Sequence, residues 1–165
     1  MGKTIAIVNQ KGGVGKTTSC VNLAAALTAL GARVLVCDFD PQGNATSGFG
    51  LDKGRSPSVY DVILGDAPMS KAVIHTKWGD VVPANKALSG ATVELIALER
   101  REFRLKDAIE EVKGSYDVIF IDCPPSLELL TLDGLCAADT LLVPVQCEYY
   151  ALEGLSDLLY TVRLA

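Results

Sequence analysis

A glycine-rich segment near the start of the chain, residues 9–18, leaves few folds open. Its sequence, NQKGGVGKTT, follows an apolar run at residues 5–8 and precedes an alanine- and leucine-rich stretch with helical spacing. A strand, a glycine-rich turn, a lysine and a helix in this order predict a phosphate-binding loop, because glycines let backbone N–H groups curl around an anion. The N-terminus of the helix adds partial positive charge there. The candidate nucleotide-binding residues are Lys11, Gly12, Gly13, Val14, Gly15, Lys16, Thr17 and Thr18.

The loop departs from the usual pattern G-x-x-x-x-G-K-[ST], since Gln10 stands at the first glycine position and Lys11 precedes the glycines. A loop with two lysines, KGGVGKTT, resembles the deviant Walker A motif of the ParA/MinD ATPases. The resemblance implies a homodimer when ATP is bound, in which Lys11 reaches across the interface and acts with Lys16 in catalysis. A glycine-rich turn without a ligand would leave both lysines unexplained.

Two carboxylates follow an apolar run at residues 34–37, in the string DFDPQGNAT at residues 38–46. The string resembles the first switch of the ParA/Soj group. This resemblance implies that Asp40 is catalytic, orienting the attacking water and helping to hold Mg²⁺, with Asp38 as a supporting carboxylate. An Asp-Pro turn at a strand end is the plainer alternative.

A third motif, IFIDCPPS at residues 119–126, ends an apolar run with Asp122 and resembles a Walker B pattern. Asp122 would meet Mg²⁺ through a water, and the two prolines would stiffen a second switch. The implied metal residues are Thr17, Asp40 and Asp122, and the implied cofactors are ATP and Mg²⁺.

Short apolar runs predict the strands of a parallel sheet that is covered on both faces, at residues 4–8, 34–37, 118–121 and 140–143, with a weaker candidate at 79–83. Helical spacing predicts two helices with apolar faces, one after the glycine-rich loop and one around residues 105–112, and further helices over residues 127–136 and 151–164. In the first two of these helices the expected apolar faces are Leu23, Leu27 and Leu30, ended by Gly31, and Leu105, Ile109 and Val112, ended by Gly114. The glycine-, serine- and asparagine-rich composition of residues 43–57 predicts a mobile loop. Strand and helix alternate, so we expect an α/β fold: a doubly wound, mainly parallel sheet of the P-loop NTPase type.

The 165 residues predict a single P-loop domain over residues 1–165. ParA-like proteins run on for about another hundred residues by the same resemblance, so the chain looks like their N-terminal two thirds and lacks C-terminal elements. Hydrophobic residues make up 49% and charged residues 21%, which indicates a soluble globular protein. A strand that begins within the first residues leaves no room for a signal peptide, and we expect a cytoplasmic protein.

The net charge of −5 does not favour nucleic-acid binding. One basic cluster, at Arg100, Arg101, Arg104 and Lys106, alternates with acids and predicts a solvated helix face. The five cysteines form no C-x-x-C pair, and small buried thiols are the expected state, with an iron–sulfur cluster across a dimer as the alternative. His75 and Trp78 have no partner of a catalytic type nearby in the sequence and are assigned to packing or surface.

The family resemblance covers essentially the whole chain, including the string EYYALEG at residues 148–154, although its adjacent tyrosines would equally suit half-buried packing. It implies an ATPase for chromosome or plasmid partitioning, with a ParB-like activator, non-specific DNA binding in the full-length form, nucleoid association and no membrane. A MinD-like membrane-cycling ATPase is an alternative, against which the DPQGN string argues. The second alternative is an interaction module that binds nucleotide without hydrolysing it.

Overall fold

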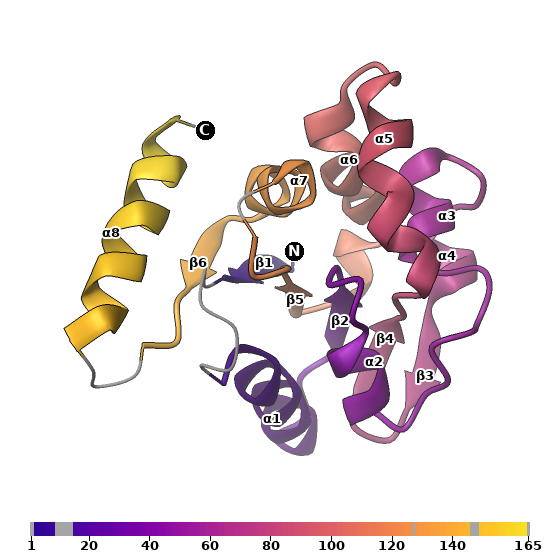
Figure 1. The fold of residues 1–165 in the computed structure, drawn as a ribbon. Coiled ribbons are helices and arrows are strands. Elements are labelled where there is room, and N and C mark those ends of the chain that lie inside the picture. Colours follow the sequence, from indigo (N-terminus) through magenta and orange to yellow (C-terminus); the bar gives the residue numbers. More distant parts are fainter. Residues whose placement is uncertain (1, 9–14, 127, 146–148, 165) are drawn as a thin grey trace.

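The computed structural model describes residues 2–8, 15–126, 128–145 and 149–164. Within these residues a six-stranded sheet forms the centre, in the order β3-β4-β2-β5-β1-β6 (Figure 1). Its pairs are parallel except β3–β4, which is antiparallel. The strands are β1 (Lys3–Ile7), β2 (Val34–Asp38), β3 (Ile74–Thr76), β4 (Gly79–Val82), β5 (Val118–Asp122) and β6 (Thr140–Leu142). The predicted doubly wound, mainly parallel sheet is therefore confirmed.

All five predicted strands are present, and their ends differ from the predicted ends by at most one residue. The sixth strand of the sheet, β3, was not predicted from the sequence. This three-residue edge strand is only partly buried, so it lacks the continuous apolar run of the central strands. It forms because the chain turns back tightly and pairs with β4.

Helices cover both faces of the sheet. On one face α1 and α2 pack against Ile7, Val36 and Phe120, and on the other the core includes side chains of α3 to α8. In Figure 1, α1 lies below the sheet and α6 and α7 lie above it. The helices are α1 (Lys16–Ala29), α2 (Asn44–Gly48), α3 (Val59–Leu64), α4 (Met69–Ala72), α5 (Ala91–Ile96), α6 (Arg104–Glu110), α7 (Leu129–Ala137) and α8 (Tyr149–Leu164), with short 3₁₀ turns at Lys86–Gly90, Arg101–Phe103 and Lys113–Ser115.

The buried face of α1 differs from the predicted leucine face, of which only Leu27 packs against the core. Leu23 is 39% exposed and Leu30 is 83% exposed, whereas Cys20 and Ala24 are fully buried. Apolar residues surround most of this helix, so spacing alone does not select a face. Small side chains at Cys20 and Ala24 let α1 lie close to the sheet. Gly31 follows the helix with a φ of +93°, as expected of a residue that ends a helix.

Two other expectations are corrected. Residues 43–57 are not all loop, because they contain α2, whose Ala45 and Thr46 are fully buried. The helix through Leu105 ends at Glu110, before Gly114, and a 3₁₀ turn follows. The predicted helices at 127–136 and 151–164 correspond to α7 and α8.

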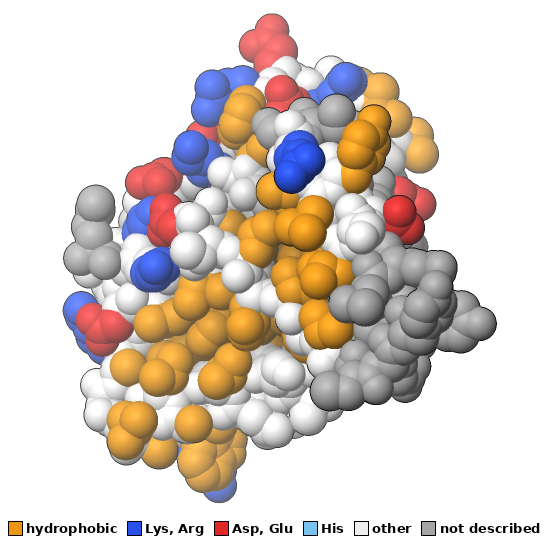
Figure 2. All heavy atoms as spheres, turned by 90° about the vertical axis from the view of Figure 1, so that its left-hand side faces the viewer, with side chains coloured by type: hydrophobic (Ala, Val, Ile, Leu, Met, Phe, Trp, Pro, Cys, Tyr) orange, Lys and Arg blue, Asp and Glu red, His pale blue; other side chains and the backbone are white. Residues whose placement is uncertain are grey.

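One side of the molecule presents many apolar side chains to solvent. Figure 2 shows them gathered on the side where α8 lies in Figure 1. A groove of about 540 Å³ runs between α1 and the end of β6, and it is lined by Thr18, Ser19, Asn22, Leu23, Ala26, Leu142 and Pro144. Among the described residues, no helix combines the length and the apolar character that crossing a membrane requires.

Candidate nucleotide site

The candidate site lies where the parallel strands end. Asp38 and Asp122 are the last residues of β2 and β5, and they are partners in the register of these two strands. The N-terminus of α1 lies at the same edge, since Lys16 contacts Asp122. Gly15 directly precedes α1 and has a φ of +80°, a left-handed conformation that favours glycine. The sheet thus gathers residues that are more than a hundred positions apart in the sequence.

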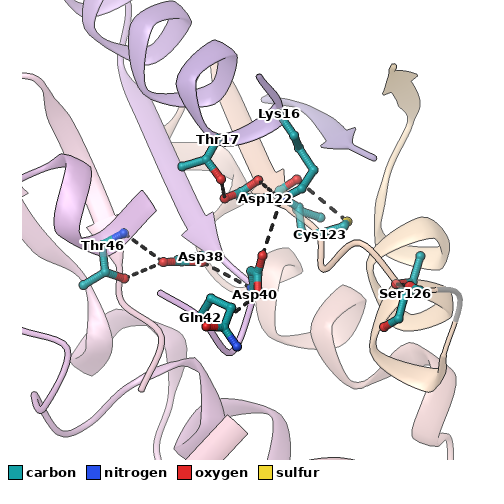
Figure 3. A network of polar contacts seen from close by, with 11 residues as sticks. Lys16, Thr17, Asp38, Asp40, Gln42, Thr46, Asp122, Cys123 and Ser126 are labelled. Carbon is teal, nitrogen blue, oxygen red and sulfur yellow. Dashed lines mark hydrogen bonds and ion pairs between the residues drawn. The ribbon is translucent and has the colours of Figure 1, made fainter. Parts of the chain in front are cut away.

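Lys16 is held between two carboxylates (Figure 3). Its Nζ donates to Asp122 Oδ1 at 2.8 Å and lies 3.6 Å from Asp40 Oδ2. Burial by itself would lower the pKa of Lys16, but the charge and hydrogen bond of Asp122 and the charge of Asp40 outweigh it, so that the pKa lies above its ordinary value. Lys16 is therefore a buried, fully charged ammonium group at the strand ends.

Thr17 and Asp122 offer oxygen atoms suited to magnesium. The hydroxyl of Thr17 donates to Asp122 Oδ2 at 3.0 Å, and Asp40 lies on the other side of Lys16. The described residues contain no group of three or more His, Cys, Asp and Glu side chains that could hold a metal by themselves. Mg²⁺ is usually held by one or two carboxylates together with substrate phosphates and waters, so a hydroxyl and two carboxylates beside a phosphate loop fit this ion.

Asp40 is fixed by the backbone around it. It is only 4% exposed, and its Oδ1 accepts a hydrogen bond from the Gln42 N–H at 3.0 Å. Its own N–H donates to Asp38 Oδ1 at 3.2 Å. The carboxylate is therefore oriented toward Lys16 rather than free to rotate.

Asp38 accepts the hydrogen bond from the Asp40 N–H and is fully buried. Burial and the nearby charge of Asp122 raise the pKa of Asp38 to about 7, although hydrogen bonds from Thr46 and Asp40 oppose the rise. The sequence analysis assigned Asp38 a supporting role, and its contacts are consistent with that role.

Some predicted site residues lie outside the described part of the chain: Lys11, Gly12, Gly13 and Val14. Of the others, Gly15 and Lys16 lie at the start of α1, and Thr18 is an exposed residue of this helix that lines the groove near β6. The structure thus brings together Lys16, Thr17, Asp40 and Asp122. The side chains of the predicted string at residues 148–154 also lie outside the described part.

Sequence reasoning missed Thr46 as a member of this network. Its hydroxyl and its N–H both donate to Asp38 Oδ2, at 2.6 and 2.8 Å. Thr46 is the last residue of the DFDPQGNAT string, so the motif itself pointed to this residue. It was overlooked because residues 43–57 were interpreted as a loop, and a loop does not predict which side chains are buried.

Other side chains mostly follow the predictions. Cys20, Cys37 and Cys123 are buried free thiols, as expected, and Cys136 is also free. His75 is exposed and contacts Asp80 at 2.8 Å. The basic cluster is only partly a solvated face, because Arg104 Nε donates to the Ile63 carbonyl at 2.7 Å, where α3 ends.

Comparison with known proteins identifies the family. The chain matches the protein-family model described as "AAA domain" over residues 2–165. The chain belongs to this AAA domain family. It is similar to the sporulation initiation inhibitor protein Soj of Bacillus subtilis, with 58% identity over 99% of this chain and 66% of that protein. It is 52% identical to the chromosome partitioning protein ParA of Myxococcus xanthus, over 99% of this chain and 59% of that protein.

A solved structure is also similar. The cobyrinic acid a,c-diamide synthase of Mycobacterium smegmatis, with a bound ATP analogue and magnesium, superposes with a TM-score of 0.94 and 45% identity, over 99% of this chain and 68% of that chain. These matches confirm the predicted ParA/Soj resemblance and the P-loop fold. The chain spans 66% and 59% of the lengths of the two curated relatives.

Proposed function

We propose that residues 1–165 form the P-loop domain of a ParA/Soj-type ATPase that binds ATP with Mg²⁺ and hydrolyses it. The observation that carries the proposal is the convergence of Lys16, Thr17, Asp40 and Asp122 at the strand ends, beside the N-terminus of α1. A cation for the phosphates, oxygen ligands for Mg²⁺ and a carboxylate to orient a water are the parts that phosphoryl transfer needs.

Nucleotide binding requires Lys16 to change partners. Its ammonium group is now paired with Asp122, and the β- and γ-phosphates would take over that role. Asp122 and the hydroxyl of Thr17 would then hold Mg²⁺, directly or through water. When bound, Mg²⁺ neutralises charge that develops on the transferred phosphoryl group. Binding of the phosphates and binding of the metal are thus coupled through one ion pair.

Asp40 is the residue that we assign to the attacking water. One of its oxygens accepts from Gln42 N–H, while Oδ2 faces Lys16 at 3.6 Å. A carboxylate oxygen held in this way orients a water and accepts a hydrogen bond from it. This interaction gains most in the transition state, so Asp40 should affect turnover more than binding.

The wider biological role rests on the relatives. The high identity to proteins named Soj and ParA supports a role in chromosome or plasmid partitioning. We extend to this chain the family expectations of an ATP-bound homodimer completed by Lys11, a ParB-like activator, and non-specific DNA binding by a full-length form in the cytoplasm. Each of these is a proposal, because the chain corresponds to only part of its relatives.

Titration calorimetry with ATP and Mg²⁺ tests the site. Lys16→Ala should weaken binding by on the order of 100-fold, because a buried phosphate cluster loses its main counter-charge. Lys71→Ala, which removes an exposed lysine from α4, is the matched control and should bind normally. Unchanged affinity of Lys16→Ala would contradict the assignment.

Turnover is tested separately with Asp40→Ala. This variant should bind ATP within a few-fold of the unchanged chain, while phosphate release falls by on the order of 100-fold. If both the unchanged chain and this variant bind ATP and neither releases phosphate, the chain is a nucleotide-binding module without turnover.

The name of the Mycobacterium smegmatis neighbour raises a second candidate, ATP-dependent amide synthesis. The identity to that protein is 45%, against 58% to Soj, and this difference favours the partition role. An amide synthase would use ATP only when its carboxylate and nitrogen donor are supplied. Phosphate release with ATP and Mg²⁺ alone would therefore support the ATPase, and strict dependence on those substrates would support the synthase.

A further inference from the structure

Thr46 joins three segments that meet under the candidate site. It is fully buried, and its hydroxyl donates to Asp38 Oδ2 at 2.6 Å while accepting a hydrogen bond from the Ala84 N–H at 3.0 Å. Its backbone N–H donates to the same Asp38 oxygen at 2.8 Å. Thr46 therefore ties α2 to the end of β2, as Figure 3 shows, and also to the segment that follows β4.

The contact continues from Asp38 to Asp40. Asp38 uses Oδ2 for Thr46 and Oδ1 for the Asp40 N–H, at 3.2 Å. The backbone at Asp40 thus lies at a position that depends on how the Asp38 carboxylate is oriented. Without the hydroxyl of Thr46, this carboxylate would lose one of its donors, and the Ala84 N–H would lose its acceptor.

The helix that carries Thr46 is too short to hold its own position. It has five residues, and isolated helices of this length are not stable in water. It lies close to α1, since a Cβ at Gly48 would be 2.9 Å from Val21 Cγ2. The helix that begins with Lys16 and the segment that carries Asp40 are thus both in contact with α2.

We propose that Thr46 is a positioning residue for hydrolysis: its hydroxyl orients Asp38, which holds the Asp40 backbone and so places the Asp40 carboxylate beside Lys16. The proposal rests on the proposed ATPase function. It predicts a loss in kcat without a matching loss in nucleotide binding, since the Thr46 hydroxyl contacts Asp38 and Ala84 rather than the phosphate-binding Lys16.

The experiment compares variants with and without the hydroxyl. Thr46→Val keeps the shape and removes the hydroxyl, Thr46→Ser keeps the hydroxyl, and Ser47→Ala removes an exposed hydroxyl from the same helix as a control. We expect kcat to fall 10- to 100-fold in Thr46→Val with KM within about threefold, and both values to stay within about threefold in Thr46→Ser and Ser47→Ala. Thr46→Ala replaces Thr46→Val if the latter does not fold.

Amide hydrogen exchange measured by NMR provides a readout that does not depend on turnover. Exchange at the Asp40 amide should rise about tenfold or more in Thr46→Val and stay unchanged in Thr46→Ser. Equal exchange at Asp40 in all variants, or a kcat of Thr46→Val within twofold of the unchanged chain, would overturn the proposal. Absence of turnover in the unchanged chain would count against the ATPase instead, and the exchange data would still decide the role of Thr46.

Discussion

Asp133 gives this protein a stability that should depend on pH. This carboxyl of α7 is fully buried, and its Oδ1 accepts one hydrogen bond, from the Leu105 N–H of α6 at 3.0 Å. Its Oδ2 is buried without a hydrogen-bond partner among the described residues. Burial raises the pKa of Asp133 from 3.8 to about 7, against the opposing effects of the Leu105 hydrogen bond and of Arg104, while Glu102 and Asp107 add to the rise.

The sign and size of this pH dependence follow from proton linkage. Between about pH 4 and pH 7 the folded protein holds a proton that the unfolded chain releases, so the free energy of unfolding falls as the pH rises through this window. Over the whole titration, Asp133 changes the free energy of unfolding by at most about 4 kcal/mol. Roughly 2 kcal/mol of this change falls between about pH 5.5 and pH 8. Asn at position 133 cannot ionise, so Asp133→Asn should remove this part of the pH dependence.

Urea unfolding of the unchanged chain and of Asp133→Asn, at several pH values between about pH 5.5 and pH 8, measures this contribution to the free energy of unfolding. The variant should gain stability relative to the unchanged chain as the pH rises, although it loses some strength in the bond to Leu105. Asp117→Asn is the control, because this carboxylate is exposed and paired with Arg33, and surface pairs contribute little. A constant stability difference between Asp133→Asn and the unchanged chain across the window would refute the reasoning.

Three further predictions concern packing, assembly and DNA. Gly134→Ala should lower the free energy of unfolding by about 1–2 kcal/mol in urea titrations, because the new Cβ would lie 2.8 Å from the buried Cys123 Sγ; combining it with Cys123→Ala should restore part of the loss. Lys11→Ala should leave the monomer folded but weaken dimerisation with a non-hydrolysable ATP analogue, and normal dimers in light scattering would count against a role in trans. In gel shifts with ATP at low salt, this chain should bind DNA more weakly than a form extended to the length of its relatives, because its net charge is −5; equal, salt-sensitive binding would instead implicate the Arg100–Lys106 cluster.

The sequence by itself determined which side chains meet at the strand ends and the type of sheet. The order of the glycine-rich loop, Asp40 and Asp122 along the chain predicted that Lys16 and these carboxylates would meet. Continuous apolar runs predicted the central strands, because strands that are buried on both faces need apolar residues on both. These signals are local, so a short stretch of residues carries each of them.

Only the tertiary structure decided which contacts hold the site in place. The buried face of α1 follows from its close approach to the sheet through Cys20 and Ala24, whereas the helix itself is apolar on several sides. The short helix α2 has no periodic pattern to detect, and it exists because Thr46 bonds to Asp38 and Ala84. Such contacts join residues 8 and 38 positions apart, and their geometry arises only when the strands are paired.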